Sequence, residues 1–397
     1  MFSKQVVTDA DVAGKRVLVR VDFNVPLVDG TVSDDTRVRA ALPTIRYLVD
    51  HDARVILMSH LGRPAGTGFE EKFSLAPAVR VLERLLGGKK VQLVPDIVGE
   101  QARQAAAALG DGDVMMLENL RFDPREKKND PEFAQQLASL ADLYVNDAFG
   151  TAHRAHASTA GVANYLPGYA GFLLAREVEA LTSMLSEPAR PFVAVLGGSK
   201  ISDKIGVIAR LTDIADTIVI GGGMCFTFLK ALGCGIGTSL LEEDWVDRAR
   251  EMLDAAEKKG TRLLLPTDVV VADEFKNEAN TRIVSRDEIP DDMMGLDIGP
   301  DSCALFSDAI AGAKTIFWNG PMGVFEMPAF ENGTKQVALA IAANSDANSV
   351  VGGGDSVSAV RQFGCEDEMT FVSTGGGASM ELVEGKELPG LAALRDA

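Results

Sequence analysis

RVLVRVDFNVP (residues 16–26) begins with a short apolar run that is rich in valine and leucine. Such a run is typical of a strand that is buried on both faces of a parallel sheet. The proline that ends it leaves Asp22 and Asn24 at the carboxyl end of the predicted strand, where a plain Asx turn explains them as well as a ligand contact does. A helical stretch follows at 36–51 and a second apolar run, RVILMSH, at 54–60. This order of elements predicts a strand–helix–strand unit of an α/β fold.

The alternation of apolar runs and helix-compatible stretches extends over the whole chain. A chain of 397 residues with 46% hydrophobic content is too long for one core and apolar enough to fill two. We therefore predict an α/β protein with two doubly wound, Rossmann-like parallel-sheet domains, separated by a cleft and joined by a long helix. The further predicted strands lie at 91–94, 113–122 and 143–149 in the first half, and at 192–198, 217–223, 262–272, 315–323, 349–355 and 369–377 in the second.

The net charge of −18 opposes nonspecific binding to nucleic acid and to anionic membranes. Residues 1–170 hold 20 Lys and Arg against 22 Asp and Glu, a balance of −2, so the remaining residues carry −16. The first residues lack the apolar region of a signal peptide, and no apolar run approaches the roughly 20 residues of a membrane span. These observations predict a cytoplasmic enzyme that binds neither nucleic acid nor a membrane.

Cationic side chains follow the predicted strands of the first half at their carboxyl ends. His60 and Arg63 lie in SHLGRP, Arg121 in ENLRF and Arg154 in GTAHRAH, and Arg37 stands at a predicted helix start, where a cation opposes the helix dipole. In a parallel sheet these loops share one edge, so the cations would converge around one crevice. Guanidinium groups match phosphate and carboxylate oxygens, which indicates a small ligand that carries both. Scattered surface arginines in ordinary salt bridges are the alternative explanation.

The second half contains glycine-rich strand ends but neither a P-loop nor a dinucleotide-binding signature. In GGSKISDK (197–204), Lys200 and Lys204 are spaced one helical turn apart, so both ammonium groups would face the same side of a helix. Their position after a glycine-rich strand end favours phosphate binding, although a solvated helix face explains such a pair as well.

Further loops of the second half contain candidate nucleotide contacts. In VVGGGDS the glycines allow close approach of a phosphate, Asp355 offers a hard carboxylate for nucleotide-bound magnesium, and Ser356 can start the next helix. STGGGAS (373–379) places backbone N–H groups at a predicted helix start, which favours a phosphoryl group. Glu326, in WNGPMGVFE, can accept from ribose hydroxyls, and Gly295 is a weaker candidate for the base pocket. Packing alone also explains many glycine-rich loops, and a plain turn explains Glu326.

In chain order, these motifs resemble those of the phosphoglycerate kinase family along nearly the whole sequence. The resemblance implies reversible phosphoryl transfer, in glycolysis and gluconeogenesis, from 1,3-bisphosphoglycerate to ADP to give 3-phosphoglycerate and ATP. It also implies dependence on Mg²⁺, closure about a hinge, and a monomer. It divides the chain into a phosphoglycerate-binding domain of residues 1–170 plus the C-terminal segment 384–397, a connecting helix 171–190, and a nucleotide-binding domain 191–383. The motifs are VDFNVP, SHLGRP, ENLRF, NDAFGTAHRAHAS, LGGSKISDK, IGGGM, WNGPMGVFE, GGGDS and STGGGAS.

The resemblance implies a role for each matching residue. Those implied to bind phosphoglycerate are Asp22, Phe23, Asn24, Arg37, His60, Leu61, Gly62, Arg63, Arg121 and Arg154. Those implied to bind ATP are Lys204, Gly295, Glu326, Gly353, Gly354, Asp355 and Ser356, with Asp355 holding magnesium through the nucleotide. Those implied to stabilise the transferring group are Arg37, Lys200, Gly375 and Gly376. An acyl phosphate has a good leaving group, so we expect cationic stabilisation rather than a general base.

Two other classes of protein are alternatives. A nicotinamide-dependent dehydrogenase is also a two-domain α/β protein, but it requires the missing G-x-G-x-x-G motif. A non-catalytic nucleotide-binding or scaffold protein would contain the arginine set only by accident.

Overall fold

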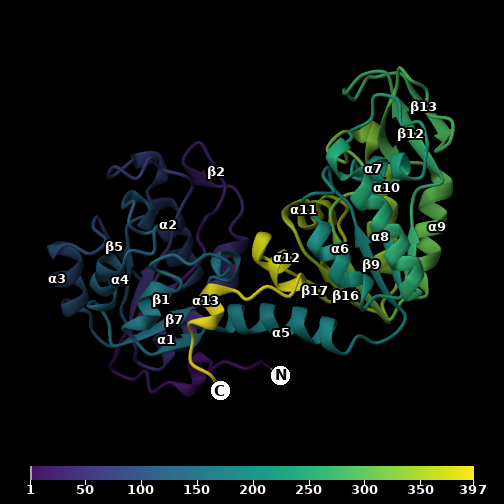
Figure 1. Cartoon of the computed structure of the whole chain (residues 1–397). Coiled ribbons are helices and arrows are strands. Elements are labelled where there is room, and N and C mark those ends of the chain that lie inside the picture. Colours follow the sequence, from purple (N-terminus) through teal and green to yellow (C-terminus); the bar gives the residue numbers. More distant parts are fainter. Residues whose placement is uncertain (1) are drawn as a thin grey trace. The chain divides into compact units, whose positions relative to one another are not determined.

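The computed structural model describes residues 2–397. The chain forms two compact units, unit 1 with Met1–Glu179 and Glu387–Ala397, and unit 2 with Ala180–Lys386. It therefore passes between the units twice. The first passage lies within helix α5 (Phe172–Ser186), which Figure 1 shows as one continuous helix. Among residues 2–397, no helix is both long and apolar enough to cross a membrane.

Unit 1 is built on a six-stranded sheet in the order β5-β6-β4-β1-β7-β8, in which every neighbouring pair is parallel. The central strand β1 (Arg16–Arg20) buries Val17, Leu18 and Val19 completely, which explains its uninterrupted apolar run. The other strands are β4 (Arg54–Met58), β5 (Val91–Val94), β6 (Val114–Leu117), β7 (Leu143–Asn146) and β8 (Gly168–Ala170), and a small hairpin joins β2 (Leu27–Val28) to β3 (Thr31–Val32). The helices are α1 (Thr36–Asp50), α2 (Ala76–Leu85), α3 (Glu100–Ala108), α4 (Pro131–Ala138) and α13 (Pro389–Ala392).

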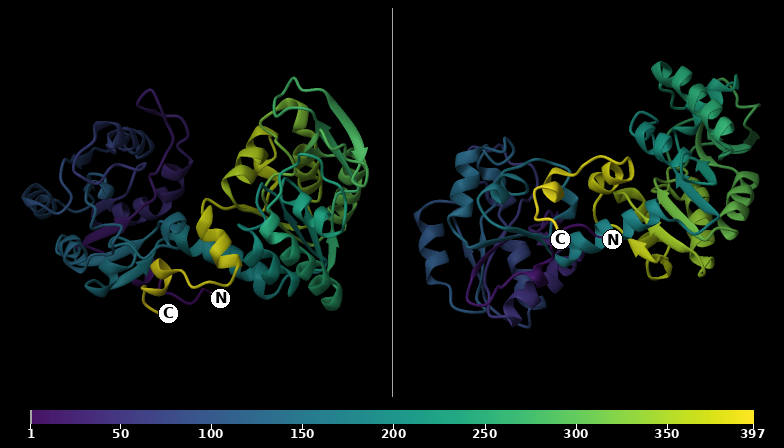
Figure 2. Two further views of the ribbon diagram at one scale, coloured as in Figure 1. Left: turned by 45° about the horizontal axis from the view of Figure 1, so that its top comes forward. Right: turned by 60° about the horizontal axis from the view of Figure 1, so that its bottom comes forward.

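The C-terminal residues belong to unit 1 through backbone pairing. The Gln5 N–H donates to the Arg395 carbonyl at 2.9 Å, and the Arg395 N–H donates to the Gly168 carbonyl at 3.0 Å. Lys4 and Asp396 form an antiparallel bridge. The two ends of the described chain consequently lie near each other, as both views of Figure 2 show.

Unit 2 contains a second six-stranded parallel sheet, in the order β11-β10-β9-β15-β16-β17. Its core includes Trp318, which is fully buried on β15. Together with the sheet of unit 1, it confirms the predicted α/β class with two Rossmann-type parallel sheets. The strands are β9 (Phe192–Leu196), β10 (Thr217–Ile220), β11 (Arg262–Leu264), β15 (Thr315–Asn319), β16 (Asn348–Val351) and β17 (Phe371–Val372). The helices are α6 (Ile205–Thr212), α7 (Cys225–Ala231), α8 (Val246–Lys259), α9 (Pro300–Ala311), α10 (Asn332–Ala343), α11 (Gly354–Gln362) and α12 (Gly377–Val383).

The prediction of a single strand over 262–272 is wrong. The segment forms two strands of different sheets, because Pro266 interrupts it and cannot donate to a strand ladder. Its second part, β12 (Asp268–Ala272), lies at the centre of a separate antiparallel sheet in the order β13-β12-β14. We did not predict its partners, β13 (Thr281–Ser285) and β14 (Met294–Ile298).

Candidate active site

The predicted anion-binding residues of unit 1 follow adjacent strands of its sheet. Asp22 comes after β1, His60 after β4, Arg121 after β6 and Arg154 after β7. These four strands are neighbours in the order β6-β4-β1-β7. Because all are parallel, their carboxyl ends meet at one edge of the sheet, as the strand pattern predicted.

An ion pair joins Asp22 to Arg37 at the start of α1. The side chain of Asp22 is only 9% exposed and that of Arg37 is 35% exposed, so the guanidinium keeps an open face. Burial alone would raise the pKa of Asp22, but the positive charges of Arg37 and Arg20 and a hydrogen bond from the Asn24 N–H oppose it, and that pKa lies below its ordinary value. Asp22 is therefore an anionic acceptor, and it explains why a cation is stable at this helix start.

His60 is held as a neutral ring. Its Nδ1 lies 3.1 Å from Nη2 of Arg20. A guanidinium only donates, so Nδ1 accepts and the ring proton sits on Nε2. Burial lowers the pKa of His60 well below its ordinary value, and the charges of the surrounding arginines add to that shift while Asp22 opposes it. The Nε2–H is consequently a neutral donor at physiological pH.

A buried network that we did not predict lies beneath these residues. Arg20 is 1% exposed and its Nε donates to Ser158 Oγ at 2.8 Å. Ser158 in turn donates from Oγ to Glu126 Oε1 at 2.6 Å. Burial raises the pKa of Glu126, although Arg20 and the bonds from Ser158 oppose the shift. An arginine inside the apolar run RVLVR was the one sequence signal that could have revealed this network.

Arg121 and Arg154 belong to the same electrostatic cluster. Arg121 donates from Nη1 to the Gly62 carbonyl at 2.7 Å, which ties two predicted site loops together. Burial lowers the pKa of Arg121, and the positive charges of Arg20 and Arg154 lower it further. Unscreened like charges of this kind favour an anion in the same place. Arg63 is exposed and follows Gly62 directly.

Four predicted contacts, Phe23, Asn24, Leu61 and Gly62, have side chains or backbone groups that stabilise the fold itself. Phe23 is fully buried and Leu61 is 3% exposed, so neither side chain can reach a ligand. The Phe23 N–H donates to Ser59 Oγ at 2.8 Å. The Gly62 N–H donates to Asn24 Oδ1 at 2.8 Å, which fixes the loop and leaves the Asn24 amide N–H groups for other partners.

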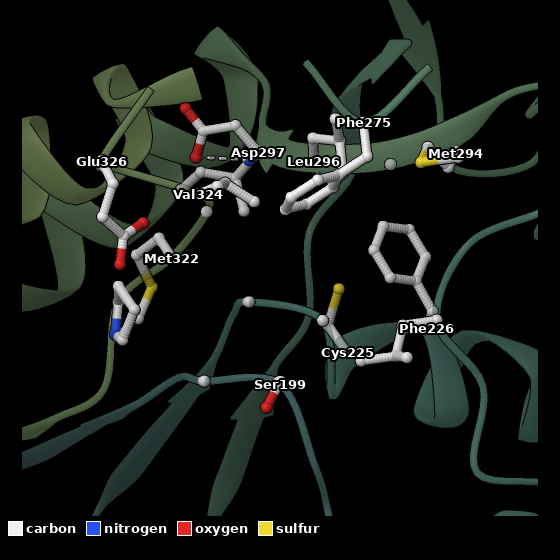
Figure 3. Close-up of a pocket in the computed structure, with 18 of the residues that line it drawn as sticks. Ser199, Cys225, Phe226, Phe275, Met294, Leu296, Asp297, Met322, Val324 and Glu326 are labelled. Atoms are coloured by element: carbon white, nitrogen blue, oxygen red, sulfur yellow. Dashed lines mark hydrogen bonds between the residues drawn. The ribbon is translucent and has the colours of Figure 1, made fainter. Parts of the chain in front are cut away.

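Unit 2 contains an apolar cavity of about 470 Å³. In Figure 3 the rings of Phe226 and Phe275 lie at one end, and the Glu326 carboxylate lies at the other, beyond Met322. Gly295 contributes to the wall, and a methyl group in its place would come within 2.0 Å of the Phe226 ring. An apolar cavity with a carboxylate at one end suits a flat heterocycle joined to a sugar.

A polar cavity of about 260 Å³ adjoins the apolar one and shares Gly198, Ser199 and Asp355 with it. Its wall contains both predicted lysines and most of the predicted phosphate loop residues. They are Lys200, Lys204, Gly353, Gly354, Asp355, Ser356 and Gly376. The shared wall makes the two cavities a continuous site within unit 2.

The expectation that Lys200 and Lys204 share a helical face is wrong. Helix α6 starts only at Ile205, and residues 202–204 form a turn, so the backbone loop rather than the helical period brings both lysines to the polar cavity. The Lys204 ammonium is bonded to Asn319 Oδ1. Burial lowers its pKa, and the acids Asp203, Asp355 and Glu384 oppose the shift. Lys200 is exposed.

Two of the glycine loops are packed against each other. A methyl group on Gly197 would lie 2.0 Å from the Pro321 carbonyl oxygen, and one on Gly320 would lie 2.3 Å from the Gly197 carbonyl oxygen. Ser356 is also structural through its side chain, since its buried Oγ accepts from the Gly320 N–H at 2.6 Å and α11 already starts at Gly354. Close backbone packing therefore explains the glycines of these two loops.

The two glycines at the start of α12 differ in their availability. The Gly375 N–H donates to Ser373 Oγ at 3.1 Å and is already engaged. Gly376 lines the polar cavity. Among the described residues, Gly376 is thus the better placed of the two to donate to a phosphoryl group.

Asp297 is a buried carboxylate that sequence reasoning missed. It lies in the wall of the apolar cavity, and its two oxygens accept from the Ile298 N–H at 2.9 Å and the Gly333 N–H at 2.7 Å. Burial raises its pKa to about 7, although these two bonds oppose the shift. It links β14 to the start of α10.

The chain resembles known proteins over its full length. A family model described as phosphoglycerate kinase matches residues 7–386. A phosphoglycerate kinase of Moorella thermoacetica is 58% identical over 395 residues and covers 100% of both chains, and one of Dictyoglomus turgidum is 56% identical over 388 residues, 98% of this chain and 97% of the other. Solved phosphoglycerate kinases of Coxiella burnetii and Pyrococcus horikoshii align with TM-scores of 0.89 and 0.84 at 43% and 34% identity, each over 98% of both chains. The chain therefore belongs to the phosphoglycerate kinase family, the glycolytic phosphotransferases that move a phosphoryl group between 1,3-bisphosphoglycerate and ADP.

Proposed function

We propose that unit 1 binds the phosphorylated three-carbon acid at the cationic edge of its sheet, and that unit 2 binds the nucleotide in its two adjoining cavities. The observation that carries this proposal is the clustering of Arg37, His60 and Arg121 around Asp22, with Arg154 near Arg121. Such a cluster needs anions, and 3-phosphoglycerate supplies a phosphate and a carboxylate.

The atoms that remain open in unit 1 suggest how the acid is held. Guanidinium groups of Arg63, Arg121 and Arg154 take the phosphate, and the His60 Nε2–H donates to a carboxylate or hydroxyl oxygen. The anionic Asp22 accepts from the hydroxyl of the ligand, with Asn24 beside it. Phe23, Leu61 and Gly62 contribute by shaping these loops.

In unit 2 we assign the base to the apolar cavity, next to Gly295, and the ribose hydroxyls to Glu326. The phosphates occupy the polar cavity, where Lys204 and the loop Gly353–Ser356 bind them. Asp355 is an exposed carboxylate on the wall shared by both cavities, and one carboxylate plus nucleotide phosphates is a donor set that Mg²⁺ accepts. Magnesium bound there would neutralise phosphate charge during transfer.

The transfer itself needs little covalent chemistry from the protein. A terminal oxygen of ADP attacks the phosphorus of the acyl phosphate, and the bond from phosphorus to the carboxylate oxygen breaks. The departing carboxylate is a weak base, so no side chain has to donate a proton. Arg37, Lys200 and the Gly376 N–H stabilise the charge on the transferring group, and Gly375 holds the turn in which Gly376 lies.

We further propose that the two units close about α5 and the segment 384–397 to align donor and acceptor, because the two sites belong to different units. The phosphoglycerate-binding domain is then 1–170 with 384–397, and the nucleotide-binding domain is 191–383, joined by residues 171–190. We propose a cytoplasmic monomer that works in both directions, in glycolysis and gluconeogenesis.

The test is a coupled assay with 3-phosphoglycerate, ATP and Mg²⁺, repeated after chelation of the metal and with Arg37→Ala and Lys200→Ala. We expect activity that depends on Mg²⁺, and about 10²–10³-fold lower turnover in both variants. Near-normal turnover of a variant would remove that residue from the catalytic role. Small-angle scattering that shows no compaction with both substrates would refute closure.

A further inference from the structure

Two buried residues at the carboxyl end of β7, Asn146 and Asp147, lie next to the cationic cluster of unit 1. Both are fully buried. The Asp147 N–H donates to the Arg20 carbonyl at 2.9 Å, and the side chain of Arg20 holds His60. The loop that carries Arg154 begins directly after Asp147. A displacement of this dipeptide would therefore also shift His60 and Arg154, two of the predicted ligand contacts.

Asp147 holds the start of α5, the helix through which the chain first leaves unit 1. Its Oδ1 accepts from the backbone N–H groups of Leu173 at 2.9 Å and Leu174 at 3.2 Å. A methyl group on Gly171 would lie 2.2 Å from the same oxygen, so the backbone is pressed against the carboxylate. The other oxygen, Oδ2, is buried and has no hydrogen-bond partner among the described residues. A helix cap needs only one carboxylate oxygen as an acceptor. Capping alone therefore does not explain why a second oxygen, unpartnered among the described residues, is buried at this helix start.

Thr44 connects the start of α5 to α1, the helix that carries Arg37 at its start. Its Oγ1 accepts from the Phe172 N–H at 2.9 Å. Burial raises the pKa of Asp147 to about 6, and the nearby Thr44 hydroxyl opposes that shift. The first turn of α5 is therefore bonded to both the strand end and α1. Arg37 and the start of α5 are therefore both held by α1.

Asn146 holds the second passage between the units. Its Nδ2 donates to the Gly390 carbonyl at 3.0 Å, in the segment that returns from unit 2. The Gly390 N–H donates to the Ala152 carbonyl at 2.8 Å, two residues before Arg154. A methyl group on Gly390 would lie 3.0 Å from the Ala152 Cα, so this contact is close as well.

We propose that Asn146 and Asp147 are positioning residues that couple occupation of the cationic cluster to both segments leading to unit 2. The geometry that carries this inference is the attachment of α5 and of the returning segment to adjacent residues of one strand end. The inference rests on the proposed closure of the two units. If it is correct, weakening the attachment leaves binding of the acid intact and impairs the step that needs both units.

The experiment compares Asp147→Ala with Asp130→Ala in the full-length protein. Asp130 is a matched control, because its Oδ1 caps α4 in the same unit by accepting from the Phe133 N–H at 2.9 Å, and α4 does not lead to unit 2. We measure Tm, the Kd for 3-phosphoglycerate alone by calorimetry, and kcat. Both variants should lower Tm, since both lose a helix cap. Only Asp147→Ala should lower kcat, by about 10-fold or more, with Kd within threefold of the parent value.

Asp147→Asn supplies the rescue. Its amide keeps an acceptor for Leu173 and Leu174 and places the NH₂ group where Oδ2 has no partner. We expect kcat to return to within threefold of the parent value. If Asp147→Ala does not fold, Thr44→Val removes the acceptor for the Phe172 N–H more gently and should lower kcat about threefold at unchanged Kd.

Two outcomes would overturn the coupling role. One is equal kcat in Asp147→Ala and Asp130→Ala. The other is a parallel loss of Kd and kcat, which would mean that Asp147 merely supports the binding site. Failure of the proposed function is distinguishable, because it shows in the parent protein as absent activity or absent compaction with both substrates.

Discussion

Replacing His60 by Asn or by Gln tests the two hydrogen bonds of its ring one at a time. Nδ1 accepts from buried Arg20 at 3.1 Å, and Nε2–H is left to donate to the ligand. The amide of Asn reaches the position of Nδ1, and the amide of Gln reaches the position of Nε2. His60→Asn should therefore keep the support of Arg20 and lose the ligand contact, whereas His60→Gln should keep the ligand contact and lose that support.

The expected magnitudes follow from these two bonds. A hydrogen bond to a charged group contributes about 1.5–3 kcal/mol, so His60→Asn should raise the KM for 3-phosphoglycerate about 10- to 100-fold. His60→Gln leaves a buried Arg20 donor without its acceptor, which costs about 1–3 kcal/mol and should lower Tm by about 2–8 °C. His60→Gln should change KM by less than about threefold.

The assay varies 3-phosphoglycerate at saturating ATP and Mg²⁺ with the coupled readout, and thermal unfolding is followed without ligand. His60→Ala, which lacks both groups, serves as the reference for the combined loss. A reversed pattern, with a high KM in the Gln variant and a low Tm in the Asn variant, would refute the assigned tautomer. A normal KM in all three variants would remove His60 from the ligand site.

Three further changes test unit 2. Lys204→Met removes a partly buried ammonium from the polar cavity and should raise the KM for ADP about 10- to 100-fold at unchanged affinity for 3-phosphoglycerate, so a KM within twofold would exclude a phosphate contact. Gly295→Ala brings a methyl group to 2.0 Å from the Phe226 ring and should raise the KM for ADP about 10-fold, measured beside Gly312→Ala, a control whose added methyl meets nothing within 4 Å. Asp297 has a folded pKa raised to about 7 against about 3.9 unfolded, so its contribution to stability is complete below about pH 4 and is lost as pH rises through 7. The Tm advantage of the parent protein over Asp297→Asn should accordingly shrink between pH 5 and 7.5, and a widening gap would contradict the burial that raises this pKa.

Local patterns in the sequence were sufficient to predict most strands and the cations that follow them. Val17, Leu18 and Val19 are buried on both faces of the sheet, so the apolar run is visible without knowledge of its partners. His60 and Arg121 stand in the loops that follow such runs. The split of residues 262–272 was missed, because a proline within an apolar run does not reveal that the chain enters a second sheet.

The contacts between distant segments were not predictable. Arg20 and Ser158 are 138 residues apart, and no spacing rule connects them. Lys204 meets Asn319 only because β9 and β15 are neighbours in the sheet of unit 2. The same register places Gly197 against Pro321 and creates the wall that the two cavities share.

The sequence by itself determined the parallel α/β class, the family resemblance and the kinds of side chain at each strand end, because these depend on residues close together in the chain. Only the tertiary structure decided which nitrogen of His60 carries the proton, which of Gly375 and Gly376 has an open amide, and what anchors α5 and the returning C-terminal segment. The physical reason is that a tautomer, an engaged N–H and a helix anchor each depend on a partner brought close by folding. Strand order, rather than sequence spacing, brings those partners together.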